Sequence, residues 1–112
     1  MDDLPEWQNL FEDEIQQAQA ARTAGNEGMA RVCARRAAGI VVGENLNRQG
    51  DNFSNPSAYE RLRYLYSKPD ISPQVREIAA HFLVRVTPNH TLPIDADLIA
   101  DAQWLQKSLI QT

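Results

Sequence analysis

The chain has 112 residues, of which 43% are hydrophobic, and its formal net charge is −4 at pH 7. This length and hydrophobic content suit one domain with one buried core, so we expect a single helical domain over residues 1–112 and no wholesale disorder. Proteins that coat nucleic acid without sequence preference are normally basic, so the negative charge argues against nonspecific duplex binding.

The cysteine content and the hydropathy of the sequence indicate the cellular compartment of the protein. Cys33 is the only cysteine, which excludes an internal disulfide and a cysteine-based zinc site. The N-terminal sequence MDDLPEWQNL lacks the basic and apolar regions of a signal peptide. No apolar run approaches the ~20 residues needed to span a bilayer. We therefore expect a cytoplasmic protein with no membrane contact.

The first predicted helix runs from Leu4 to about Thr23. Its apolar stripe comprises Trp7, Leu10, Phe11, Ile15 and Ala18. Gly25 can take the left-handed conformation that ends a helix, and Asn26 can cap the next helix. Two long helices joined by so short a turn should run antiparallel.

The second predicted helix, residues 27–48, is apolar or small nearly all round, which is typical of a helix surrounded by other helices. Its main stripe comprises Met29, Val32, Cys33, Ala37 and Ile40. Gly39 and Gly43 would let another backbone come close, although glycine inside a helix costs about 1 kcal/mol relative to alanine. We therefore predict that this helix lies at the centre of the fold.

Three shorter helices are predicted after a loop at residues 49–56, from which Phe53 can reach the core. They cover residues 57–67, residues 73–86 with Ser72 as N-cap, and a last segment that Asp95 caps and that ends near residue 110. The stripe of the middle one comprises Val75, Ile78, Ala79, Phe82, Leu83 and Val86. No strand pattern occurs. The expected fold class is all-α, a five-helix bundle built on a long antiparallel helix pair.

Arg76 and His81 have a spacing that could carry chemistry. On a helix they lie on the two flanks of the face opposite the apolar stripe, with Ala80 and Val84 between them. A two-fold axis would bring two arginines and two histidines into one cleft. Histidine transfers protons near neutral pH and arginine holds phosphate, so together they suffice for metal-free RNA cleavage by the ribose 2′-hydroxyl. Spacing alone favours the simpler interpretation, a surface histidine and an arginine paired with a carboxylate.

Arg31 and Arg35 share a helix face and form a second candidate site, for an anion or phosphate. Arg36 points nearer the apolar stripe, where Glu14 of the first helix could pair with it. For this arginine cluster, an inter-helix ion pair is the favoured interpretation. The consecutive carboxylates at 12–14 point in different directions on a helix, and no zinc or di-iron motif occurs. We therefore predict no metal and no cofactor.

The run Ala18–Asn26, AQAARTAGN, precedes an alanine-rich helix that contains Arg35 and Arg36. This pattern resembles the opening helix pair of HEPN domains (higher eukaryotes and prokaryotes nucleotide-binding). The second half is also similar: a short helix, a helix holding Arg-x4-His, a loop and a closing helix. Arg76 to His81 matches the Arg-x4–6-His motif of ribonuclease-type members, but Glu77 stands where active members usually have a polar residue such as Asn. The resemblance spans roughly residues 14–109.

The resemblance implies three alternative functions. The preferred one is a homodimeric interaction module without catalysis, whose protein partner is an antitoxin or a nucleotidyltransferase in a toxin–antitoxin or nucleotidyltransferase-linked system. The second is a metal-independent endoribonuclease that acts on RNA, with His81 as general acid or base and Arg76 as phosphate clamp. The third is a nucleotide-binding module in which Arg31 and Arg35 meet phosphate. The negative charge and Glu77 favour the first alternative.

Overall fold

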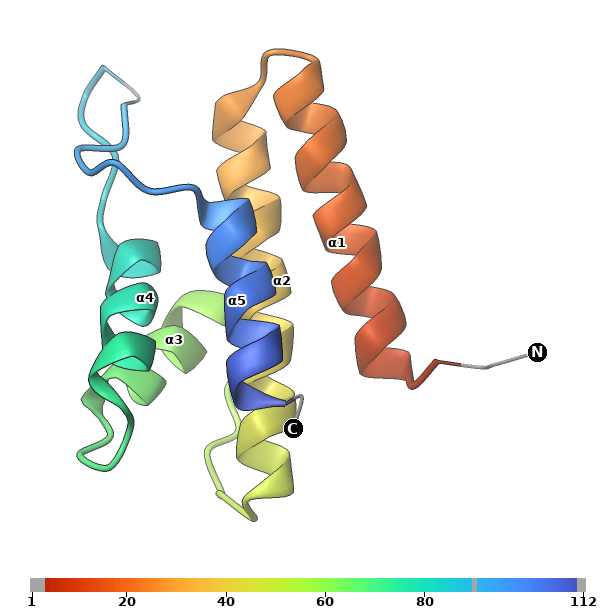
Figure 1. Ribbon diagram of the computed structural model, residues 1–112, viewed down its shortest axis with the longest axis vertical. Coiled ribbons are helices and arrows are strands. Elements are labelled where there is room, and N and C mark those ends of the chain that lie inside the picture. Colours follow the sequence, from red (N-terminus) through yellow and green to blue (C-terminus); the bar gives the residue numbers. More distant parts are fainter. Residues whose placement is uncertain (1–3, 90, 111–112) are drawn as a thin grey trace.

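The computed structural model describes residues 4–89 and 91–110, which form five α-helices (Figure 1). They are α1 (Glu6–Thr23), α2 (Glu27–Arg48), α3 (Ala58–Ser67), α4 (Pro73–Leu83) and α5 (Leu98–Leu109). No strand occurs in these described ranges, so the predicted all-α fold class is confirmed. Within the same ranges, no helix has both the length and the apolar character needed to cross a membrane.

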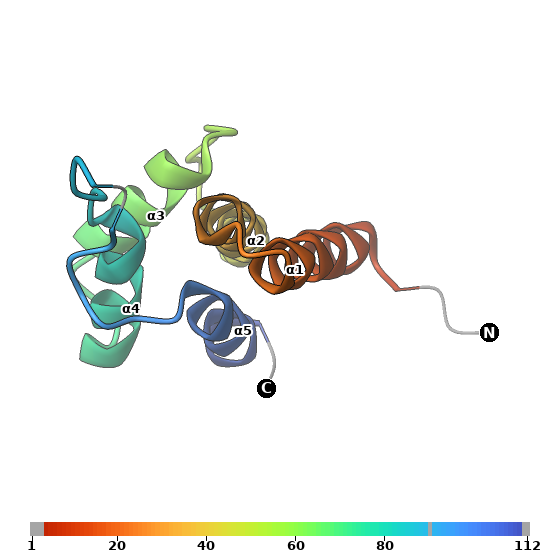
Figure 2. The same cartoon turned by 90° about the horizontal axis from the view of Figure 1, so that it is seen from above.

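Helix α2 occupies the centre of the fold, as its apolar sequence predicts. It packs against α1, α3 and α5, whereas α4 packs mainly on α3. Seen from above, α1, α2 and α5 lie close together, and α3 and α4 lie on one side of them (Figure 2). The chain reverses direction between α1 and α2 (Figure 1). α2 therefore connects the two groups of helices.

Adjacent residues set several helix ends. Gly25 has a φ of +81°, the left-handed conformation that glycine adopts without steric cost, and it follows the end of α1. The side chain of Asn26 accepts a hydrogen bond from the amide of Met29 at 3.1 Å and caps α2. Ser72 caps α4 in the same way, through the amide of Val75 at 3.2 Å. These predictions are confirmed.

Two predicted helix ends are wrong. α4 ends at Leu83, three residues before the predicted Val86, because Val84 takes an extended conformation with φ −72° and ψ 131°. Val84 therefore lies outside α4 and does not separate the two predicted catalytic residues on a helix face. α5 is capped by Asp97 and not by Asp95, since the side chain of Asp97 accepts hydrogen bonds from two amides in the first turn.

The core combines small side chains of α2 with larger ones from the surrounding helices. Its largest fully buried side chains are Phe11, Phe82, Leu46, Leu62, Leu65, Leu98, Leu105, Val41, Val42 and Cys33. Four residues of the predicted apolar stripes are exposed instead: Leu10 on α1, Met29 and Val32 on α2, and Val86 in the segment after α4. The neighbours of α2 cover the side that carries its alanines, which leaves the opposite side of its first turns open to solvent.

Helices α2 and α3 approach each other closely at two glycines, as predicted. A Cβ atom at Gly39 would lie 2.5 Å from Cβ of Ala58. One turn later, Gly43 lies against the guanidinium of Arg61. Arg61 donates hydrogen bonds from Nη1 to the carbonyl oxygen of Gly39 at 3.2 Å and from Nε to that of Asn55 at 2.7 Å. The absence of two side chains on α2 thus gives α3 direct access to the helix backbone.

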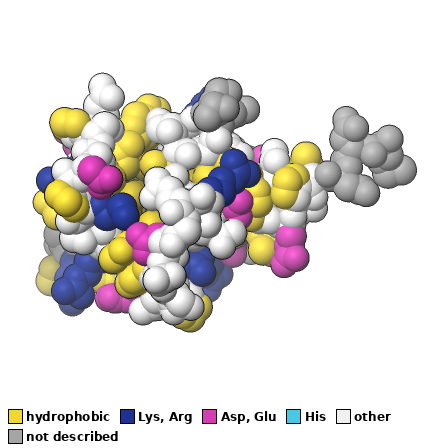
Figure 3. Space-filling view, turned by 90° about the horizontal axis from the view of Figure 1, so that it is seen from below, with side chains coloured by type: hydrophobic (Ala, Val, Ile, Leu, Met, Phe, Trp, Pro, Cys, Tyr) yellow, Lys and Arg dark blue, Asp and Glu magenta, His cyan; other side chains and the backbone are white. Residues whose placement is uncertain are grey.

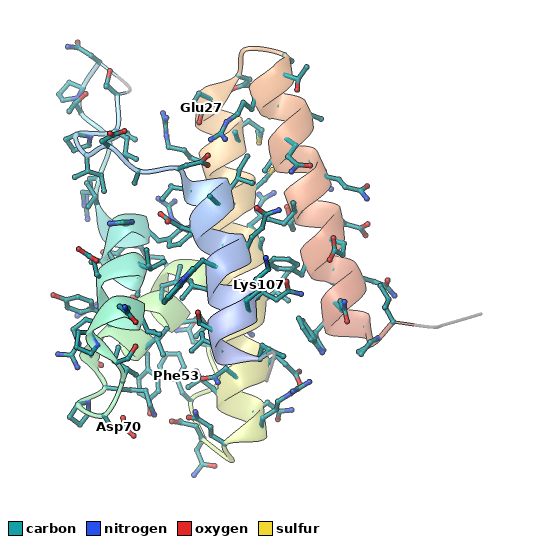
Figure 4. The ribbon with its side chains drawn as sticks, in the orientation of Figure 1. Glu27, Phe53, Asp70 and Lys107 are labelled. Atoms are coloured by element: carbon teal, nitrogen blue, oxygen red, sulfur yellow. The ribbon has the colours of Figure 1, made fainter. Side chains whose placement is uncertain are left out.

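The loop after α2 is held on α3. The Phe53 ring stacks on Tyr64, with centroids 4.2 Å apart, and packs against the core as predicted. Asp51 accepts hydrogen bonds from the Tyr64 hydroxyl at 2.9 Å and from Nζ of Lys68 at 3.0 Å. The Lys68 ammonium holds the pKa of Asp51 below its usual range. Phe53 lies at the opposite end of the fold from Glu27 (Figure 4).

Polar contacts join both ends of α5 to the rest of the fold. Arg22 forms ion pairs with Glu27 at 2.8 Å and with Asp97 at 3.0 Å, and so links the turn between α1 and α2 to the start of α5. Near the other end, Nδ2 of Asn45 donates a hydrogen bond to the carbonyl oxygen of Leu109 at 3.2 Å. Asn45 is the only buried polar side chain of the described residues. α5 is therefore tethered at both ends.

Candidate functional site

The two predicted catalytic residues of α4 contact different neighbours. Nη2 of Arg76 donates a hydrogen bond to the carbonyl oxygen of Lys68, 2.7 Å away, directly after α3. His81 pairs with α5 instead, since its Nδ1 lies 2.9 Å from Oδ2 of Asp101. Arg76 thus uses a backbone oxygen where the sequence predicted a carboxylate, and His81 has a carboxylate partner that the sequence did not predict.

A hollow of about 500 Å³ lies beside Arg76, between the end of α3 and the start of α4. Its other lining residues are Tyr66, Pro69, Ile71, Pro73, Glu77 and Ala80. Nε of Arg76 is buried and has no hydrogen-bond partner among the described residues. Glu77 is exposed, and its carboxylate would repel a phosphate here. His81 does not line this hollow, so one copy of the chain does not bring Arg76 and His81 to a common ligand pocket.

His81 and Asp101 form a partly buried dyad between α4 and α5, with 27% and 13% of their side-chain surfaces exposed. Burial raises the pKa of Asp101, and the hydrogen bond from His81 opposes that shift. An ionised Asp101 would accept a hydrogen bond from the Nδ1–H group and hold the imidazole ring, so that Nε2 would be the nitrogen able to exchange a proton. No sequence signal links these two residues, because they lie on different helices.

Arg31 and Arg35 border one groove of about 620 Å³, which we call the arginine groove. It lies between the first turns of α2, the start of α3 and the segment that follows α4. Its lining residues are Gly28, Arg31, Val32, Arg35, Tyr59, Leu83, Val84, Arg85 and Val86. The spacing of four residues correctly predicts that Arg31 and Arg35 lie together.

Arg35 is held in position by the end of α4. Its Nε donates a hydrogen bond to the carbonyl oxygen of Phe82 at 3.2 Å. The last carbonyl oxygens of a helix lack donors within that helix, so Arg35 supplies one of the missing donors. Burial lowers the pKa of Arg35, but arginine stays protonated in proteins. The groove therefore contains a positive charge whose position is fixed before any ligand binds.

Arg85 and Tyr59 complete the groove, and neither is among the site residues predicted from the sequence. Arg85 follows α4, is exposed, and forms no hydrogen bond or ion pair with the described residues. Tyr59, in the first turn of α3, is 37% exposed. The run from Val84 to Val86 has β-branched residues on both sides of Arg85 and precedes Pro88. That pattern is a signal for an extended segment that could have indicated the early end of α4.

The apolar side of the arginine groove is open to solvent. Val86 is 45% exposed and Val32 is 36% exposed, and both line the same groove as Tyr59. Elsewhere the surface mixes charges of both signs with apolar side chains, as the view from below shows (Figure 3). Exposed apolar side chains that gather in one concave place are typical of a binding site, whereas single ones need no explanation.

The remaining predicted polar contacts differ from the structure. Arg36 is exposed and forms no ion pair with Glu14. Oε1 of Glu14 is buried without a hydrogen-bond partner in the described ranges. Burial raises the pKa of the Cys33 thiol, and the nearby Glu14 carboxylate adds to this shift. No group of three His, Cys, Asp or Glu side chains that could hold a metal ion occurs among the described residues.

No protein-family model matches the chain, and no curated protein or solved structure shows significant similarity to it. The arginine groove and the His81–Asp101 dyad are therefore the structural features from which a function can be inferred.

Proposed function

We propose that this chain is a HEPN-like helical interaction module that acts as a homodimer, has no catalysis of its own and binds through the arginine groove. The observation that carries the proposal is the groove itself, where Arg35 and Arg85 flank exposed Val32, Tyr59 and Val86. Arginine and aromatic residues are enriched in protein interfaces, and apolar side chains at the centre of an interface supply much of its affinity.

The surroundings of the predicted catalytic pair support the absence of catalysis. Arg76 donates to the carbonyl oxygen of Lys68, and His81 contacts Asp101 on another helix. Glu77 adds a negative charge to the hollow beside Arg76. A phosphate clamp and a general base need to reach one substrate phosphodiester, and within one copy these side chains are directed to different places.

The proposed module acts in the cytoplasm, and its protein partner is an antitoxin or a nucleotidyltransferase. Two measurements test the function. Light scattering at high micromolar concentration should give the mass of two copies, and a mass of one copy would contradict the homodimer. A labelled single-stranded RNA in EDTA should stay intact with the wild-type chain, and specific cleavage would contradict the non-catalytic role.

The second candidate function is a metal-independent endoribonuclease, and the His81–Asp101 dyad favours it. In this case Nε2 of His81 is the general acid or base, and Arg76 of a second copy is the phosphate clamp. Cleavage in EDTA should then disappear in His81→Ala and Arg76→Ala, and should fall in Asp101→Asn. Equal cleavage by all three variants and the wild type would indicate a contaminating nuclease.

The third candidate is a nucleotide-binding module, and the position of Arg31 and Arg35 in one groove favours it. Their guanidinium groups would meet phosphate, and Tyr59 would stack on the base. Calorimetric titration with ATP and GTP should then show binding that is lost in Arg35→Ala. Heats equal to those of dilution would eliminate this candidate.

A further inference from the structure

Helix α1 carries a surface strip with the opposite charge to the arginine groove. Glu6, Leu10 and Asp13 recur at intervals of four and three residues, so they share one side of the helix, and all three are exposed. We call these three residues the acidic strip. No carboxylate of α1 forms an ion pair with any described residue. The strip therefore has negative charge that no described residue neutralises through an ion pair.

The acidic strip lies on an outer helix of the fold. α1 packs on α2 and touches α5 only slightly, and Figures 1 and 2 show it at the edge of the helix group. Leu10, at the centre of the strip, is 46% exposed. A large exposed leucine between two exposed carboxylates is complementary to a surface that is both apolar and basic.

We propose that the arginine groove of one copy receives the acidic strip of α1 from a second copy. Two-fold symmetry makes the contact reciprocal, so each dimer contains it twice and no open surface remains to build a chain of molecules. This inference rests on the proposed homodimeric function and names the surfaces that form the dimer.

The chemistry of the two surfaces matches. Arg35 and Arg85 face the carboxylates of Glu6 and Asp13, and Leu10 enters the apolar part of the groove. Five of the nine groove residues are apolar or aromatic, so the lining favours a leucine between carboxylates over a bare phosphate group.

The size of the chain also fits a reciprocal contact. A stable dimer buries about 800 Å² of each partner. That area is about a ninth of the 6972 Å² surface of one copy. Because each copy contributes both a groove and a strip, either contact needs to supply only about half of the area.

A charge-reversal cycle, measured by sedimentation equilibrium on the full chain, tests the inference. Asp13→Arg or Arg85→Glu places like charges in the contact, so each should raise the dimer dissociation constant about tenfold or more. The double variant exchanges the two charges and should dimerise nearly as tightly as the wild type. Both side chains are exposed, so circular dichroism should show an unchanged helical fold in every variant.

Arg63→Glu is the matched control, since Arg63 is an exposed arginine of α3 outside the groove. It should leave the dissociation constant unchanged. A wild-type dimer that tolerates both single reversals would overturn this inference and leave the homodimer intact. A wild-type chain with the mass of one copy would overturn both the inference and the homodimer.

Discussion

The two halves of α2 differ in how they meet the rest of the chain. In the second half, Gly39 and Gly43 have no side chain, so α3 packs directly on the helix backbone. In the first half, Val32 and Arg35 continue the same face, and the segment after α4 stays far enough away to leave a groove. We call the second half of α2 the closed half, because glycines there let α3 pack on the helix backbone. The first half carries large side chains on the same face, and a groove remains there.

The largest expected effect comes from filling the closed half. Gly39→Leu would force a side chain into Ala58 of α3, so we expect a loss of about 3 kcal/mol in the free energy of unfolding. Urea denaturation measures it. Gly28→Leu is the control, because a Cβ there meets only Oδ1 of Asn26 at 3.8 Å and leucine favours a helix over glycine, so it should not lower the free energy of unfolding. An equal loss of unfolding free energy in both variants would contradict the difference in packing between the two halves of α2.

Removal of two methyl groups at matched positions sharpens the comparison. Val42 is fully buried, so Val42→Ala should cost about 2 kcal/mol through lost burial and a small cavity. Val32 is exposed at the groove, so Val32→Ala should cost less than about 0.5 kcal/mol. Thermal unfolding of the two variants, at a concentration low enough to keep the chain monomeric, measures the difference. A cost at Val32 as large as at Val42 would mean that the groove is closed in solution.

Arg61 closes the second half with hydrogen bonds. Arg61→Met keeps much of the apolar stem but removes the donors to the carbonyl oxygens of Gly39 and Asn55. We expect a loss of about 1 kcal/mol in urea denaturation, since one α2 carbonyl then loses its second donor. Arg63→Met on the same helix should be neutral, because Arg63 is an exposed side chain that pairs only with Glu60.

The smallest expected effect is a pH dependence in the loop that follows the closed half. Hydrogen bonds from Lys68 and the Phe53 amide lower the pKa of Asp51 in the folded chain. A depressed folded pKa stabilises the fold above the unfolded pKa of about 3.9, and this contribution disappears as the pH falls through the folded pKa. When the pH is lowered, the melting temperature of Asp51→Asn should therefore fall less than that of the wild type. A loss equal to that of the wild type would exclude Asp51 as a contributor.

The parts of the fold that depend on neighbouring residues could be predicted from the sequence. The left-handed turn at Gly25 and the caps Asn26 and Ser72 are local, and each forms as predicted. The predicted end of α4 was wrong because Val86 fits an apolar helical stripe but lies in the segment that follows the helix. Leu10 fits a stripe equally well, yet the packing of α1 on α2 leaves it exposed.

In the candidate site too, contacts within one helix could be predicted from the sequence, and contacts between helices could not. The joint position of Arg31 and Arg35 follows from their spacing on one helix. Arg85 reaches the groove only because α4 ends early, and Asp101 reaches His81 only because α4 and α5 lie side by side. Contacts between helices depend on packing angles and helix ends, which the order of residues does not reveal directly.

The hydrogen bond of Asn45 has a consequence for the register of α5. The other buried residues of α2 are apolar and mostly small, and α2 packs against α5. A shift of α5 by one turn, about 5.4 Å, would separate the Asn45 amide from the carbonyl oxygen of Leu109. A buried amide without a partner costs about 1–3 kcal/mol, so Asn45 penalises a shifted α5 in addition to the ion pair of Arg22 with Asp97 at the other end of the helix.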